Sequence, residues 1–134
     1  MALEFLSCSL RSNLDMRDFK TLEIWRRAVL LAKNLNELTQ SFPAVEKFGL
    51  SMQIKRSGVS IASNIAEGCG RRTTADLRHF IHIAIGSCFE LETQIEIAFL
   101  SQYMCIDTYK TLSSDIKTLQ KMIIAFSKGL GVRY

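Results

Sequence analysis

The sequence has few of the residues that break a chain. It contains one proline and seven glycines in 134 residues, and 48% of its residues are apolar. This composition favours a packed helical protein and argues against disorder. Charged residues interrupt every 18-residue window of the long apolar patterns, so the sequence predicts no transmembrane helix. The length suits one domain with a single core.

Closely spaced cysteines are also missing. The four cysteines contain no C-x-x-C pair, and three of them lie in or beside predicted helices: Cys8, Cys69, Cys88 and Cys105. This spacing favours reduced thiols over a disulfide framework. The first fifteen residues lack the basic start and the apolar run of a secretion signal. We therefore expect a cytoplasmic protein with no membrane partner.

Four helical patterns follow one another. The first covers about residues 21–40 and ends before Phe42-Pro43, because proline disfavours helical geometry in the preceding residue. The second covers about residues 48–67, and we expect Gly68 to form its left-handed cap and Cys69 to lie in the following loop. The third opens at Thr73-Thr74, where either hydroxyl can cap a backbone amide, and the fourth covers about residues 109–130.

The apolar residues of these helices recur at steps of three and four, which is typical of near-parallel helices in a bundle. In the first helix we expect the core face to contain Leu22, Trp25, Val29 and Ala32, with Leu31, Leu35 and Leu38 on its shoulder. In the third it contains Leu77, Ile81, Ala84, Cys88, Leu91, Ile95, Ala98 and Gln102. In the fourth it contains Tyr109, Leu112, Ile116, Leu119, Ile123, Phe126 and Leu130. The short connections predict an all-α fold, an antiparallel up-down four-helix bundle.

The two middle helices have little polar surface. On the second helix Ile54, Ile61 and Ile65 form one stripe, and another face contains Met52, Val59, Ala62 and Ala66. The third helix carries further apolar residues outside its core face: Ile83, Ile85, Phe89 and Ile97. The first and fourth helices have polar outer faces. Because a monomeric bundle keeps one wet face on each helix, we expect a homo-oligomer built through the middle helices.

The net charge of +4 is unevenly distributed. Six basic residues lie between positions 47 and 78, against only Glu67 and Asp76: Lys47, Lys55, Arg56, Arg71, Arg72 and Arg78. Between positions 90 and 107 the charged residues are all acidic: Glu90, Glu92, Glu96 and Asp107. Such polarity can steer an anionic partner to one end of the molecule, or it can be an ordinary solvated surface.

Residues 56–71, RSGVSIASNIAEGCGR, resemble the signature of bacterial four-helix bundle proteins encoded in intervening sequences of 23S ribosomal RNA genes. Relatives of that family include the accessory variability proteins of diversity-generating retroelements. Further matches are Asp18-Phe19, Trp25, Ala28, Phe42-Pro43, Glu46, Gly49-Leu50, Gln53-Ile54, Gly86-Ser87 and Glu90-Leu91-Glu92. Members begin near Met16, so the resemblance implies a bundle domain over residues 16–134 and an N-terminal extension over residues 1–15.

The resemblance implies a pentameric ring with no established enzymatic activity and no cofactor. In the retroelement branch a basic surface engages nucleic acid and a reverse transcriptase. Carried over to this chain, the candidate contacts to RNA or DNA are Lys55, Arg56, Arg71, Arg72 and Arg78. The family usually has two alanines where this chain has Ser57-Gly58, and glycine costs about 1 kcal/mol against alanine inside a helix.

The residues of the family motif that we expect to have a structural role are Gln53, Ser60, Asn64, Glu67, Gly68 and Gly70. Asn64, Glu67 and Arg71 are the most suggestive polar set near the end of the second helix. They indicate either a pocket for a ligand or partner, or contacts between packed helices. We favour the second interpretation, in which Ser60 and Asn64 satisfy groups between helices and Glu67 pairs with an arginine.

Enzymatic sites have little support in the sequence. His79 and His82 lie three residues apart, but a metal site in a bundle also needs inward carboxylates from other helices, and the apolar faces supply none. Cys69 and Cys88 have no sequence-evident base. Two functions therefore stay open: an accessory protein that binds the backbone of RNA or DNA, and a protein-only scaffold that ignores nucleic acid.

Overall fold

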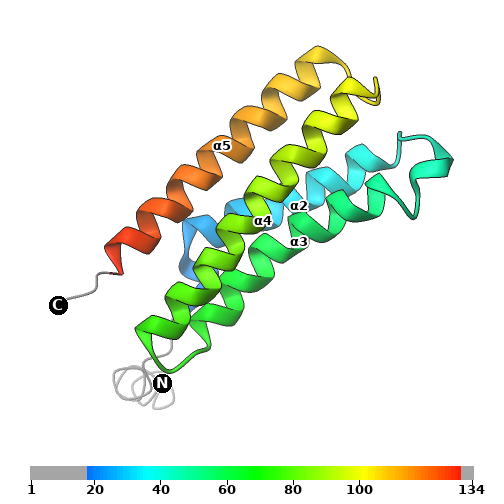
Figure 1. Cartoon of the computed structure of the whole chain (residues 1–134). Helices are drawn as coiled ribbons and strands as arrows, with labels where there is room; N and C mark the ends of the chain where they lie inside the picture. Colours follow the sequence, from blue (N-terminus) through cyan, green and yellow to red (C-terminus); the bar gives the residue numbers. More distant parts are fainter. Residues whose placement is uncertain (1–17, 131–134) are drawn as a thin grey trace, which may run out of the picture.

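The computed structural model describes residues 18–130 of the chain, and over these residues it is helical throughout, with no strand. Four long helices lie alongside one another in Figure 1: α2 (Glu23–Thr39), α3 (Leu50–Cys69), α4 (Thr74–Leu100) and α5 (Ile106–Gly129). Two short 3-10 helices, η1 (Phe19–Thr21) and η2 (Ala44–Glu46), precede α2 and α3 respectively. The predicted extension over residues 1–15 lies outside the described residues.

The core faces predicted for α4 and α5 are confirmed. Seven of the eight residues expected on the core face of α4 are buried, from Leu77 to Ala98. The eighth, Gln102, was wrong: α4 ends at Leu100, and Gln102 is exposed in the following turn with a φ of 64°. On α5, Leu112, Ile116, Leu119 and Ile123 are buried, and the outer members of the stripe are partly buried against the core. Long stripes at steps of three and four therefore locate the packed face of a helix well.

The core face predicted for α2 was wrong. The buried residues of α2 are Ile24, Ala28, Leu31, Leu35 and Thr39, whereas Val29 is 40% exposed and Trp25 only partly buried. The outer face of α2 also carries the exposed Leu30, so it is not the clean polar face that we expected. Apolar residues flank both sides of the true stripe here, and the pattern alone does not fix the rotation of the helix.

The two long connections at one end of the molecule contact each other. α2 ends at Thr39, and Phe42 packs beside Tyr103 from the α4–α5 connection, with ring centroids 5.3 Å apart. Phe42 is buried although it lies outside any helix. This contact joins the α2–α3 connection to the α4–α5 connection.

The outer face of α3 carries fewer apolar side chains than expected, whereas three of the four expected on α4 are exposed and Ile85 is partly buried. On α3 the stripe Ile54, Ile61 and Ile65 is fully buried, and Val59 is its one exposed large apolar residue. On α4 the side chains of Ile83, Phe89 and Ile97 are exposed, each by roughly two-fifths to one-half. Within residues 18–130 no helix is both long and apolar enough to cross a membrane.

Candidate functional site

The five basic residues predicted to contact nucleic acid fall into two groups. Arg71 and Arg72 follow α3 directly, and Arg78 lies in the second turn of α4, so these three gather at the α3–α4 turn. Lys55 and Arg56 lie on α3, 15 or more residues before Arg71. At a rise of 1.5 Å per residue they are about 22 Å from Arg71 along the helix axis. The structure therefore brings together three of the five residues.

Gly68 does not cap α3 in a left-handed conformation, as we had expected. The helix continues through Gly68 to Cys69, and the capping residue Gly70 has right-handed geometry with φ of −82°. Gly68 is buried, and a Cβ there would lie 3.0 Å from Phe80 Cβ and 3.2 Å from the Leu77 carbonyl oxygen. Glycine is needed here because α4 passes too close for a side chain.

The start of α4 follows the prediction. Thr73 caps the helix, and its Oγ1 accepts a hydrogen bond of 3.1 Å from the backbone N–H of Asp76. Asp76 in the first turn places a negative charge near the positive end of the helix dipole. The α3–α4 turn is thus a short, well-capped connection that carries arginine on both sides.

Arg71 is held in place by two contacts. Its Nη2 donates to Glu67 Oε1 at 2.6 Å, and its guanidinium carbon lies 4.6 Å from the centre of the Phe80 ring. The ion pair is half exposed, so it contributes at most about 1 kcal/mol. Both contacts fix the direction of the guanidinium beside an open depression of about 520 Å³, which Ser63, Ala66 and Gly70 also line.

Of the remaining polar residues of the signature, Ser60 joins α3 to α4, whereas Asn64 bonds within α3. Ser60 Oγ lies 2.9 Å from Ser87 Oγ of α4, and Asn64 Nδ2 donates to the Ser60 carbonyl oxygen at 2.8 Å. Gln53, in the first half of α3, is exposed. The contact of Ser60 with α4 and the pair of Glu67 with Arg71 are those that the structural interpretation predicts.

The histidines of α4 do not share a partner. His79 is exposed and its ring stands edge-on to Phe80, with centroids 5.5 Å apart. His82 Nε2 lies 3.0 Å from Ser127 Oγ of α5. Over residues 18–130, no group of three or more histidine, cysteine, aspartate or glutamate side chains is arranged to hold a metal ion.

The thiols of the packed helices are buried. Cys69 lies in the last turn of α3, not in a loop as we had expected, and it is 1% exposed. Burial, with a smaller effect of Glu92, raises the pKa of Cys88 to about 12, so this thiol stays protonated at neutral pH. A protonated, buried thiol is a poor nucleophile.

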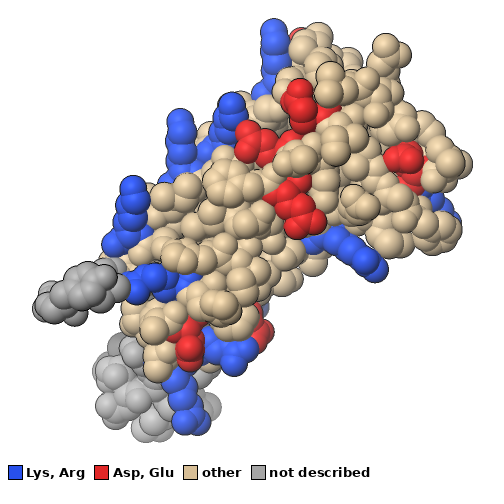
Figure 2. All heavy atoms as spheres, in the orientation of Figure 1, with Lys and Arg blue, Asp and Glu red and all other residues tan. Residues whose placement is uncertain are grey.

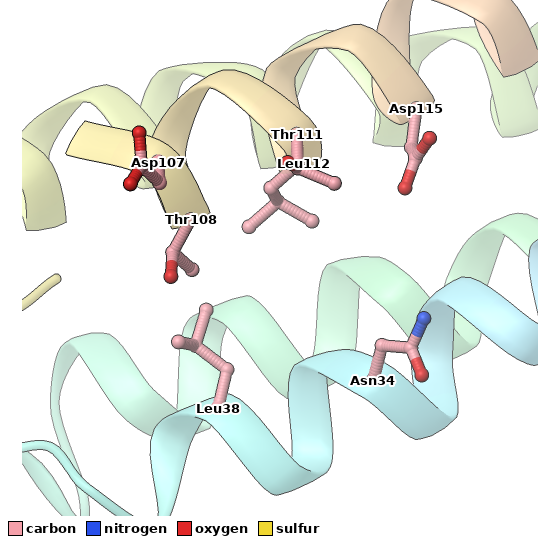
Figure 3. Close-up of a pocket in the computed structure, with 7 residues that line it drawn as sticks. All are labelled: Asn34, Leu38, Asp107, Thr108, Thr111, Leu112 and Asp115. Atoms are coloured by element: carbon pink, nitrogen blue, oxygen red, sulfur yellow. The ribbon is translucent and has the colours of Figure 1, made fainter. Parts of the chain in front are cut away.

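The sequence analysis missed a groove between α2 and α5. Figure 3 shows side chains from these two helices facing each other across it. Its wider part has a volume of about 350 Å³ and is lined by Asn34, Leu38, Asp107, Thr108, Thr111, Leu112 and Asp115. The narrower continuation shares Asn34 and Asp115. A signal was present, because these two polar residues interrupt the leucine stripes at Leu31-Asn34-Leu38 and Leu112-Asp115-Leu119.

Comparisons with known proteins agree with this fold. The family model described as 23S rRNA-intervening sequence protein matches residues 20–125 of the chain. A crystal structure of a protein with unknown function from the S23 ribosomal protein family of Bacteroides thetaiotaomicron VPI-5482 is 25% identical in sequence. The similarity covers 78% of this chain and 95% of that chain, with a TM-score of 0.72. No curated protein matches the chain.

The family match spans α2, α3 and α4 completely and most of α5. It includes the signature over residues 56–71, the buried Gly68 and the contact between Ser60 and Ser87. The chain therefore belongs to the 23S rRNA-intervening sequence protein family.

Proposed function

We propose that this protein is a non-enzymatic, oligomeric helical bundle that binds the backbone of RNA or DNA through the arginines of its α3–α4 turn. The observation that carries the proposal is the gathering of Arg71, Arg72 and Arg78 beside the start of α4. Guanidinium groups match phosphate oxygens, and the first amides of a helix attract anions. Phe80 lies under Arg71 and is not free to stack on bases, so binding is independent of base sequence.

The bundle that presents this turn is an up-down bundle with antiparallel neighbours. Three contacts between α4 and α5 support this arrangement: His82 with Ser127, Glu92 with Gln120, and Glu96 with Tyr109. Residue numbers rise along α4 while those of the partners on α5 fall. The contact between Ser60 and Ser87 joins α3 to α4 across their short connection.

The oligomer is built through the outer face of α4, with a pentameric ring as the form implied by the family resemblance. Ile83 and Ile97 lie on this face two heptads apart and are 39% and 48% exposed. A second copy that covers them removes apolar surface from water. In a ring the α3–α4 turns of all copies lie at one rim, so their arginines bind a polyanion together.

The test of nucleic-acid binding compares two adjacent arginine pairs. R71Q/R72Q removes the proposed contact, and R26Q/R27Q is the matched control, because Arg27 pairs with Glu23 as Arg71 pairs with Glu67. Affinity for a duplex is measured by fluorescence anisotropy between 50 and 200 mM salt. Losing two phosphate contacts weakens binding on the order of 50-fold at 0.1 M salt and lowers the salt slope by about 1.8. Equal losses in the two variants, or no binding by the native protein at 50 mM salt, would refute the proposal.

The test of assembly uses two residues of matched exposure on different helices. Ile83 on α4 is 39% exposed and Val29 on α2 is 40% exposed. Sedimentation velocity at micromolar concentration should show that I83D dissociates the oligomer while V29D leaves it intact. A native protein that sediments as a stable monomer contradicts the oligomer.

The alternative function is a protein-only scaffold, and one surface favours it. Val45, Phe48 and Leu100 are 82%, 77% and 71% exposed at the end of the molecule where the two connections meet. Exposed apolar groups of this size are typical of protein contacts. The scaffold replaces the first proposal if the native protein ignores RNA and DNA at 50 mM salt and V45S/F48S abolishes binding to a purified partner.

A further inference from the structure

Four lysines form a straight row on the outer face of α5. Lys110, Lys117, Lys121 and Lys128 are spaced by seven, four and seven residues, and all four are exposed. At 3.6 residues per turn they fall within about 40° of one another around the helix. They span 18 residues, about 27 Å along the axis at 1.5 Å per residue. Blue side chains follow the edge of the molecule that α5 forms in Figure 2.

The row is free of acidic partners. The ion pairs of residues 18–130 are those of Arg27, Lys33 and Arg71 with a glutamate four residues away, and none includes a lysine of α5. Acidic residues lie on both sides of the row: Asp107 and Asp115 line the groove towards α2, and on the side of α4 Glu92 and Glu96 line a hollow that Lys117 also borders. All four lysines are therefore available to an anion.

The length and rigidity of the row fit an extended polyanion. A stretch of 27 Å corresponds to about eight steps of a duplex at 3.4 Å per step. Most residues between the lysines on this face are small or polar, including Ser114, Thr118 and Ala125, and the one large apolar residue among them, Ile124, is partly buried. Within the described part of α5, no aromatic ring lies among them, so the row offers no platform for the stacked bases of a single strand.

A lipid surface fits the row less well. Helices that bind membranes place a wide apolar face next to their lysines. Here the apolar face of α5 is buried in the bundle, with Leu112, Ile116 and Ile123 in the core. Of the large apolar residues of α5, Ile106 in its first turn is the one that is strongly exposed, at 47%, so the outer face has no wide apolar strip.

We propose that the lysine row of α5 is a second binding surface that holds the phosphate backbone of a double-stranded nucleic acid along the bundle. This inference rests on the proposed function, and it extends the contact from the α3–α4 turn to the length of the molecule. Lysine ammonium groups bind phosphate as point charges, so the row selects duplex over single strand by shape and reads no sequence.

The test neutralises three lysines of the row and three lysines elsewhere. K110Q/K117Q/K121Q is compared with K20Q/K33Q/K47Q, which removes the same charge from exposed lysines outside α5. Circular dichroism checks that both variants are folded. With a 20-base-pair duplex we expect the α5 variant to bind on the order of 10²–10³-fold more weakly at 0.1 M salt, with a salt slope lower by about 2.7. The control should change far less, and an oligothymidine of equal length should bind the native protein more weakly than the duplex.

Four outcomes are informative. If R71Q/R72Q loses duplex binding but the α5 variant does not, the proposed function stands and the lysine row is refuted. If both triple variants lose affinity equally, net charge alone is responsible and the row is refuted. If the α5 variant loses binding to vesicles with 30% phosphatidylserine while keeping the duplex, the partner is a membrane. If the native protein binds no nucleic acid at 50 mM salt, both proposals fail.

Discussion

The bundle has one closely packed seam and one open seam. Between α3 and α4 the residues in contact are small: Gly68 leaves no room for a Cβ, and the hydroxyls of Ser60 and Ser87 lie 2.9 Å apart. Between α2 and α5 the facing residues are larger or charged, and a groove of about 350 Å³ remains, lined by Leu38, Asp115 and their neighbours. Small side chains let helix axes approach, while a carboxylate keeps its hydration and holds the helices apart.

The family signature lies on the closely packed seam. Residues 56–71 supply Ser60, which contacts Ser87 of α4, and Gly68, which allows α4 to approach. Helix packing thus accounts for these two residues of the signature. The surfaces proposed to bind nucleic acid lie at the end of the signature, where Arg71 begins the α3–α4 turn, and on the outer face of α5. The contrast between the two seams predicts how the molecule responds to chemical probes and substitutions.

The largest expected effect is in thiol reactivity. Cys88 is buried in the core, whereas Cys105 is exposed at the end of the groove, where the Thr108 hydroxyl lowers the pKa of its thiol. Modification of Cys88 requires opening of the bundle, which costs several kcal/mol. We expect Cys105 to react with a thiol reagent at pH 8 at least about 10³-fold faster than Cys88, a ratio that mass spectrometry of timed samples measures. Similar rates at both sites would show that the packed seam opens readily.

The same thiol predicts a pH dependence of stability. The pKa of Cys88 is about 12 in the folded protein, against 9.0 for a thiol that is not buried. As the pH rises, the unfolded chain therefore loses this proton before the folded protein does. The contribution of this protonated thiol to the free energy of unfolding is fully present below pH 9 and is lost between about pH 9 and 12. C88A should therefore flatten the fall of the free energy of unfolding in this range, as urea titrations measure. An unchanged pH profile would contradict burial of the thiol.

The next largest effect comes from a methyl group added to the packed seam. G68A places a Cβ 3.0 Å from Phe80 Cβ and 3.2 Å from a backbone oxygen, so α4 must move. We expect a loss of about 1–3 kcal/mol in the free energy of unfolding. Gly86 of α4 is the control, because a Cβ there meets nothing within 4 Å. G86A should stabilise by about 0.5–1 kcal/mol through helix propensity, and a G68A protein as stable as G86A would refute close approach.

A smaller effect tests the departure from the family pattern. Ser57, where the family usually has alanine, is buried, and its Oγ has no hydrogen-bond partner. S57A removes an unsatisfied hydroxyl and improves helix propensity, so we expect a gain of about 1 kcal/mol in thermal or urea unfolding. G58A should be closer to neutral, because its Cβ would displace only the flexible end of Leu35, 2.7 Å away. A loss of stability in S57A would mean that the hydroxyl has a partner.

The contrast also shows what sequence patterns can and cannot predict. The stripes of α4 and α5 were predicted because each continues for several turns at steps of three and four. The role of Gly68 was mistaken, because a left-handed cap and a close helix contact both require a residue without a side chain. The rotation of α2 was mistaken because Val29 and Leu30 flank the true stripe. The lysine spacing of α5 is visible in the sequence, but its role requires knowing which face is packed.

The smallest expected effect compares one hydroxyl from each seam. Ser87 bonds to Ser60 in the packed seam, whereas Thr111 lines the groove and is exposed. S87A leaves Ser60 without its partner on α4 and should cost about 1 kcal/mol, while T111A should change stability by less than about 0.5 kcal/mol. Alanine improves helix propensity at both positions, so the difference in stability between the two variants reflects the difference in packing between the two seams. Urea unfolding, analysed with a common m-value, measures this difference in the free energy of unfolding. If T111A costs as much as S87A, the groove is closed in solution, and the two seams do not differ as described.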